Sequence, residues 1–203
     1  MHLDELVMDP EAPIHAIAGF IDGLDSHERW AQVQRLGRDQ QRLLYRKAQP
    51  SSIDLGHFIK DAGPLTEVVH DGVNTLPVAA RLRRFQKRFC RPDDADTGRL
   101  LGYNEGPLRR LIGPGYFVAV RTDNDDTWQS RGGVVVDYYD VPRGAVARGW
   151  PRVVPNGRGL QRYVYHETRD FMRRVSDHVC VGAVFKRDQP MDHYFVLCRR
   201  DMA

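Results

Sequence analysis

Short runs of valine and aromatic residues dominate the second half of this chain of 203 residues. The clearest are YFVAV at 116–120, GVVVDYY at 133–139, HVCVGAVF at 178–185 and HYFVLCR at 193–199, with LLGYNE at 100–105 as a weaker example. Runs of this length that are rich in β-branched and aromatic residues are typical of β-strands. They predict a sheet in the carboxyl-terminal half.

The links between these runs indicate how the sheet is connected. TDNDDTWQS joins the first two strong runs and RDQPM joins the last two, so each pair is expected to form an antiparallel hairpin. Between the pairs, apolar residues recur at helical spacing and predict one long helix over 160–176: Leu160, Val164, Phe171 and Val175. The expected fold class is α+β, an antiparallel sheet of four to six strands with this helix packed on it.

The amino-terminal region is expected to be helical. Residues 14–24 carry an apolar face at helical spacing, Ser26 is a candidate N-cap for a second helix, and Asp39 can cap a third. Proline and glycine break up residues 49–76, which are expected to be mainly loop.

Residues 77–90 favour an amphipathic helix, although FQKRFC within them also alternates as a strand does. The expected organisation is a mainly helical region, 1–97, packed on an α+β domain, 98–203. One continuous domain over 1–203 is the alternative.

Composition narrows the class of protein. A hydrophobic content of 41% and a mean hydropathy of −0.52 fit a folded chain, and the apolar runs are too short to span a bilayer. The acidic start, MHLDELVMDPEAP, does not resemble a secretory signal, and three cysteines fit a reducing compartment. A cytoplasmic location without a membrane span is therefore expected.

Charge is unevenly distributed although the net charge is only +3. Residues 1–31 are acidic, residues 81–91 are basic, and residues 143–174 hold eight arginines. The arginines either belong to solvated faces and pair with the acidic amino-terminal region, or form an anion-binding surface. Nucleic-acid binding is not favoured, because a charge of +3 is modest and Phe85 and Phe89 fit a core stripe better than a stacking platform.

His166-Glu167-x-x-Asp170 resembles the His-Glu-x-x-His motif with which zinc hydrolases bind their metal. On the predicted helix, however, His166 shares the polar face with arginines that would repel a cation. Aspartate also replaces the second histidine, and no third ligand is evident. Neither a metal nor a cofactor is predicted.

The same residues predict an anion site. The turn before the predicted helix holds Asn156, Gly157, Arg158 and Gly159, and the helix would then present a basic face of Arg162, His166, Arg169 and Arg173. Free backbone N–H groups at a helix start, close to arginines, can receive phosphate or carboxylate. The leading hypothesis is a non-enzymatic ligand-binding or interaction protein, which engages an anionic small molecule or an acidic protein surface.

Two other functions stay open. Tyr103, Asn104, Glu105 and Tyr163 mark a possible pocket at the strand ends, where a small-molecule enzyme could use tyrosine, asparagine, glutamate or histidine groups for acid–base chemistry. A purely structural protein is the third interpretation. No catalytic residue is assigned, and the sequence leaves the oligomeric state open.

Overall fold

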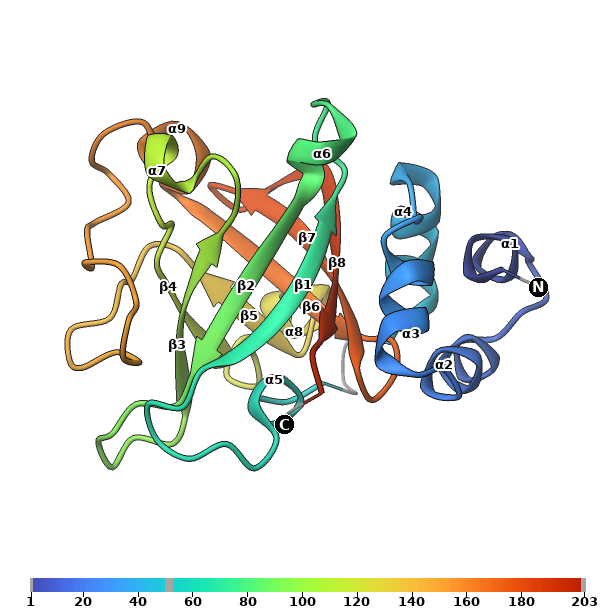
Figure 1. The fold of residues 1–203 in the computed structure, drawn as a ribbon, viewed down its shortest axis with the longest axis horizontal. Helices are drawn as coiled ribbons and strands as arrows, with labels where there is room; N and C mark the ends of the chain where they lie inside the picture. The colour runs from blue at the N-terminus through green and yellow to red at the C-terminus, as the bar shows by residue number, and fades with distance from the viewer. Residues whose placement is uncertain (1, 50–52, 202–203) are drawn as a thin grey trace.

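A closed barrel of eight antiparallel strands forms the centre of the computed structural model, which describes residues 2–49 and 53–201 (Figure 1). Each strand pairs with the next in the chain, and β8 closes the barrel against β1. The strands are β1 (Val68–Asn74), β2 (Arg84–Cys90), β3 (Arg99–Glu105), β4 (Phe117–Arg121), β5 (Val134–Asp137), β6 (Thr168–Arg174), β7 (Val179–Lys186) and β8 (Gln189–Arg199). The expected sheet of four to six strands with one long helix is wrong.

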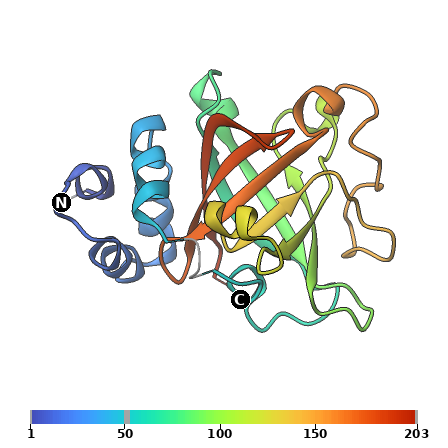
Figure 2. The ribbon, with the colours of Figure 1, turned by 180° about the vertical axis from the view of Figure 1, so that it is seen from behind.

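The helices fall into two groups. α1 (Leu3–Met8), α2 (Ile14–Asp22), α3 (Ser26–Val33) and α4 (Arg38–Lys47) form a layer outside the barrel, beside β7 and β8 (Figures 1 and 2). Short helices lie in the connections: α5 (Gly56–Ile59), α6 (Ala80–Arg83), α7 (Arg109–Ile112), α8 (Asp126–Arg131) and α9 (Gln161–Val164). Helices are present where they were expected in the first quarter of the chain, as α2, α3 and α4, whereas the region 1–97 as a whole also contains the strands β1 and β2. Within the described part of the chain, no helix has the length and apolar character needed to cross a membrane.

The long helix expected over 160–176 does not exist. Its first turn is α9, Glu167 then adopts a left-handed backbone conformation with φ of 60°, and residues 168–174 continue as β6. Along β6, Asp170 faces the barrel interior, whereas Phe171 packs outside against the ring of Phe185. The apolar spacing is compatible with both structures, and pairing with β5 and β7 on either side decides for the strand.

The prediction of a helix over residues 77–90 is also wrong for most of that range. Only α6 is helical, and residues 84–90 form β2. Their alternation directs Phe85, Lys87 and Phe89 into the barrel, as the competing strand pattern had indicated.

The remaining strand predictions are confirmed, and both expected hairpins are antiparallel pairs. Residues 49–76 were expected to be mainly loop, but they contain β1, in which Gly72 is an interior position of the strand. The expected division after residue 97 falls in the link between β2 and β3, which are paired neighbours in the barrel.

The two ends of the barrel differ. α5 lies at one end, where Phe58 packs against Phe89 with ring centroids 4.8 Å apart and helps to fill the interior. α6, α7 and α9 lie at the other end (Figure 1). Apolar side chains therefore close the α5 end, whereas the opposite end contains a cavity that α6, α7 and α9 surround.

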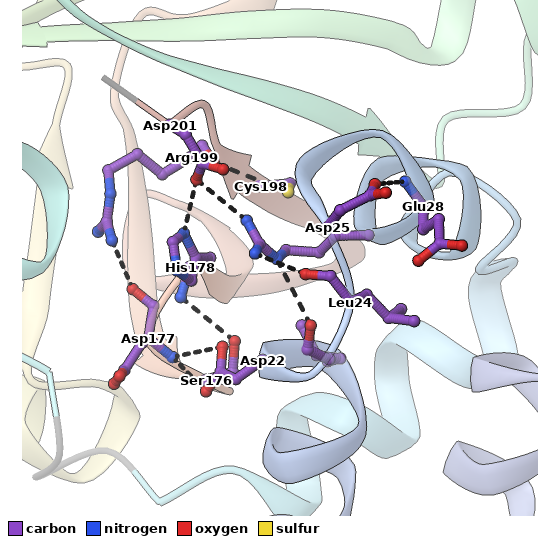
Figure 3. A network of polar contacts seen from close by, with 12 residues as sticks. Asp22, Leu24, Asp25, Glu28, Ser176, Asp177, His178, Cys198, Arg199 and Asp201 are labelled. Atoms are coloured by element: carbon purple, nitrogen blue, oxygen red, sulfur yellow. Dashed lines mark hydrogen bonds and ion pairs between the residues drawn. The ribbon is translucent and has the colours of Figure 1, made fainter. Parts of the chain in front are cut away.

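A second apolar core joins the helical layer to β7 and β8, and a buried arginine supplements it. The guanidinium of Arg29 donates to the carbonyl of Leu24 at 2.9 Å and pairs with Asp201 at 3.2 Å. Nearby, the carboxylate of Asp22 accepts the backbone N–H of Asp177 from the β6–β7 turn (Figure 3). The helical layer is thus held by directional contacts as well as by apolar packing.

Three glycines make room for phenylalanine rings inside the barrel. Gly72, Gly102 and Gly182 lie directly opposite Phe85, Phe117 and Phe195 on the neighbouring strands. In each pair the ring lies over the glycine, so that a Cβ atom there would overlap ring atoms at 2.3 to 2.8 Å. The pairs explain how a narrow barrel holds several large aromatic residues.

Gly102→Ala is expected to destabilise the protein by about 2 kcal/mol, the usual scale for overpacking a core. The added methyl group would lie 2.3 Å from the Phe117 ring and 2.6 Å from the Arg88 carbonyl oxygen. Urea denaturation measures the loss. Gly144→Ala is the matched control, because a Cβ atom at Gly144 meets nothing within 4 Å. Equal stability of the two variants would contradict the close packing of the Phe117 ring on Gly102.

Candidate functional site

A cavity of about 390 Å³ occupies the barrel interior at the end surrounded by α6, α7 and α9. Its walls are largely apolar and include Leu82, Phe85, Ile112, Tyr165, Val184 and Phe195. Polar side chains lie at its floor, deep in the barrel. The volume lies within the range of about 300 to 1,000 Å³ that is usual for small-molecule sites.

Four side chains form what we call the polar floor: Lys87, Asn104, Tyr138 and Asp170. Strand pairing brings them together in two pairs. Lys87 of β2 lies directly opposite Asn104 of β3, and Asp170 of β6 lies opposite Val136 of β5, which is on the same face as Tyr138. Tyr138 follows β5 by one residue and keeps its inward alternation.

Lys87 is the centre of the polar floor. Its Nζ lies 3.0 Å from Oδ2 of Asp170 and 3.0 Å from Oδ1 of Asn104, and it also donates to the hydroxyl of Tyr138. The Tyr138 hydroxyl lies 3.2 Å from the same Asp170 oxygen. Every proton of an ammonium group at Lys87 therefore has an acceptor.

Neighbouring groups hold the polar floor in place. The amide nitrogen of Asn104 donates to the Gly115 carbonyl at 3.0 Å and to the Tyr138 hydroxyl at 3.0 Å. The Tyr138 ring stacks on Tyr165, with centroids 5.3 Å apart. Both contacts restrict the side chains that surround the lysine, so the site is ordered before any ligand binds.

Burial and the neighbouring charge shift the pKa values of Lys87 and Asp170 in opposite directions. Burial lowers the pKa of Lys87, while the Asp170 carboxylate opposes that shift; burial likewise raises the pKa of Asp170, opposed by Lys87. The rings of Phe117 and Phe195, 5.0 and 4.9 Å from Nζ, favour the charged amine. The pair can therefore exchange one proton between an ionic and a neutral form.

The same burial keeps the phenol protonated. It raises the pKa of Tyr138 well above 10, and the nearby Asp170 carboxylate raises it further. At neutral pH the polar floor thus offers a hydroxyl, an amide and a lysine–carboxyl pair to whatever enters the cavity.

The structure brings together three of the four residues of the expected pocket. Asn104, Glu105 and Tyr163 line the cavity, and Asn104 belongs to the polar floor. Glu105 pairs with Arg109 at 2.7 Å, and Tyr163 is 72% exposed near the mouth. Tyr103 has the opposite orientation in β3 and packs outside the barrel against Trp150, with ring centroids 5.0 Å apart.

The residues of the expected anion site do not share a helix face, because residues 160–176 are not one helix. Asn156 is buried and donates to the carbonyls of Tyr116 and Tyr138. The other members of the expected turn and two members of the expected basic face are exposed: Gly157, Arg158, Gly159, Arg162 and His166.

The last two members of that expected face have partners within the protein. Arg169 pairs with Asp137 at 3.0 Å and with Asp188 at 3.2 Å. Arg173 donates to the carbonyls of Tyr45 and Ala48. Both guanidinium groups are therefore engaged in structural contacts.

The His166-Glu167-x-x-Asp170 motif is split by the change from α9 to β6. His166 is exposed, whereas Asp170 lies inside the barrel beside Lys87. Among residues 2–49 and 53–201, no three histidine, cysteine, aspartate or glutamate side chains are grouped as a metal site would require.

Lys87 and Asp170 are candidate site residues that sequence reasoning missed. From the sequence, Lys87 was interpreted only as one of the charges in the basic stretch 81–91. Asp170 was interpreted only as part of the motif that begins at His166. The sequence did contain a signal that could have identified Lys87. Phe85, Lys87 and Phe89 are spaced two residues apart, which places the lysine on the apolar face of a strand. A lysine at such a position is buried only with a partner, which is a reason to suspect function.

Comparisons with protein-family models, with curated proteins and with solved structures find no match for this chain. Its function is therefore inferred from the cavity itself.

Proposed function

We propose that this protein binds a small, largely apolar molecule inside its barrel, with a polar head group directed at the polar floor. The observation that carries the proposal is a cavity of about 390 Å³ with apolar walls and a buried, hydrogen-bonded lysine–aspartate pair at its base. An eight-stranded barrel has an interior of the width that holds one small ligand. Apolar walls supply affinity, and a few fixed polar groups select the head group.

The head group is expected to be neutral, such as a hydroxyl or a carbonyl. The charge of Lys87 is already balanced by Asp170, 3.0 Å away. A carboxylate at the floor would add a second anion next to Asp170 in a low-dielectric interior, which is unfavourable. A neutral oxygen, in contrast, can accept a hydrogen bond from Tyr138 or Lys87 in exchange for one of their contacts within the polar floor.

An anionic ligand is the second candidate, and the mouth of the cavity favours it. Arg84 and Lys186 line the mouth without an acidic partner among the ion pairs of the described residues, and Arg109, which pairs with Glu105, also lines the cavity. A carboxylate or phosphate held there would leave its apolar part in the cavity. This candidate keeps the expected anionic ligand but moves it from the 156–173 segment to the barrel mouth.

A fluorescence titration with N-phenyl-1-naphthylamine tests the proposal. The probe is expected to brighten on binding and to be displaced by 1-decanol. Val184→Trp should abolish binding, because Val184 lines the cavity and an indole there would fill it. Met8→Trp, which adds the same ring at an exposed position of α1, should leave binding unchanged. Undiminished probe binding by Val184→Trp would refute the proposed site.

Decanoate separates the two candidates. If the anionic ligand is preferred, decanoate will displace the probe at lower concentration than 1-decanol, and Arg84→Gln will remove that advantage. If the neutral head group is preferred, 1-decanol will displace the probe more effectively, and Arg84→Gln will have little effect.

An enzyme acting in the same cavity is the remaining alternative, since the polar floor combines an amine, a carboxyl and a phenol. A cytoplasmic location stays part of the proposal. Three free, buried cysteines are consistent with it: Cys90, Cys180 and Cys198.

A further inference from the structure

We propose that Lys87 forms an imine with an aldehyde or ketone that enters the barrel cavity. This inference rests on the proposed function, because it requires that a small molecule occupies the cavity, and it names the class of ligand. It adds a covalent step that binding alone does not need.

The position of Lys87 supports the inference. Its amine lies at the floor of a largely apolar cavity, between the rings of Phe117 and Phe195. The chain has only four lysines, and Lys87 is the one that is buried, with a side-chain exposure of 2%. A lysine desolvated in an apolar pocket is the usual form of an amine that attacks carbonyl carbons.

The neighbours of the amine supply the proton transfers. Asp170 lies at 3.0 Å from Nζ, and the Tyr138 hydroxyl contacts both groups. In the neutral form of the pair, a carbonyl oxygen that approaches Nζ from the cavity would therefore lie close to two O–H groups, those of the Asp170 carboxyl and of Tyr138. Imine formation needs such a donor twice, for the addition and for the loss of water.

The reaction balances without any other reagent. In the neutral form of the pair, the Nζ lone pair attacks the carbonyl carbon, a C–N bond forms, and the Asp170 carboxyl proton passes to the carbonyl oxygen. The nitrogen then returns a proton to the Asp170 carboxylate. Asp170 donates that proton to the hydroxyl group, the C–O bond breaks, and water leaves. A protonated imine remains, paired with the Asp170 carboxylate.

The electrostatic environment of Lys87 suits both the neutral amine that reacts and the cationic imine that forms. Burial favours the neutral amine that begins it. The cationic imine that ends it takes over the place of the ammonium group beside Asp170 and the two phenylalanine rings. The polar floor would therefore stabilise the product by the same contacts that now hold the lysine.

Reductive trapping tests the inference on the intact chain. The protein is incubated with decanal and sodium cyanoborohydride, and peptide mass spectrometry then locates the decyl group. We expect the label on Lys87 in preference to Lys47, Lys60 and Lys186. Lys87→Arg should lose the label, whereas Lys60→Arg, which changes an exposed lysine outside the cavity, should keep it.

Failure of the imine proposal and failure of the proposed function would give different results. If decanal and 1-decanol displace N-phenyl-1-naphthylamine but the label avoids Lys87, the imine is refuted and the proposed function survives. If neither compound displaces the probe, the proposed function itself fails. Labelling of the exposed Lys60 as readily as Lys87 would likewise overturn the inference, and this result is read from the unmutated protein without any variant that has to fold.

Discussion

Lys87→Met is expected to lower the free energy of unfolding by about 4 kcal/mol, the scale for breaking a buried ion pair by removing one partner. The substitution keeps the length of the side chain but leaves the Asp170 carboxylate in the barrel without its counter-charge at 3.0 Å. Asp170→Asn should be destabilising for the same reason, because it strands the ammonium group. In a chain of this size the loss corresponds to a fall in Tm of roughly 10 °C.

The double variant Lys87→Met/Asp170→Asn is expected to recover most of this loss, since it removes both charges together. A double-mutant cycle measured by urea denaturation gives the coupling directly. Lys60→Met, at an exposed lysine of the same chain, is the control and should change stability little. If Lys87→Met costs no more than Lys60→Met, or if the double variant is as unstable as the single ones, the two charges are not a buried pair.

The second large effect is a loss of stability in acid, centred on His70. This side chain is fully buried at the α5 end, where one ring nitrogen hydrogen-bonds the Phe58 carbonyl at 2.9 Å. Its pKa is lowered from 6.5 to about 4, mainly by burial and also by the nearby Arg199, against the opposing effects of the Phe58 hydrogen bond and Asp71. Burial also lowers the pKa of His57 well below 6.5.

The direction of the pH effect follows from these shifts. Below pH 6.5 the unfolded chain takes up a proton at His70, whereas the folded chain resists until about pH 4. The free energy of unfolding is therefore unaffected by the titration of His70 above pH 6.5. It decreases as the pH falls towards 4, by about 3 kcal/mol for His70 alone. His57 acts in the same direction.

Unfolding free energies at pH 7.5, 6.0, 5.0 and 4.5 measure this loss. His70→Gln keeps a donor for the Phe58 carbonyl but cannot titrate, so it should be less stable at neutral pH and show a shallower decline in acid. His27→Gln, at an exposed position of α3, should decline as the unmutated protein does. Parallel curves for His70→Gln and the unmutated protein would contradict a buried neutral imidazole.

The sequence indicated part of the cavity lining but not the polar floor as a whole. It placed Tyr103, Asn104, Glu105 and Tyr163 in a pocket at the strand ends, and all of them but Tyr103 line the cavity. It missed Lys87 and Asp170, because each lies in a segment that was expected to be helical. On a helix, Asp170 would share a polar face with His166, whereas on β6 it points into the barrel.

The amino-acid sequence alone determined the amino-terminal helices and the strands of the two expected hairpins, since their patterns are strong and local. Only the tertiary structure decided that residues 84–90 and 168–174 are strands. Their apolar spacing suits a helix or a strand, and the choice depends on neighbours that supply hydrogen bonds on both sides. Closure of the barrel then brought Lys87 and Asp170, 83 positions apart in the chain, within 3.0 Å of each other, a contact that no local pattern contains.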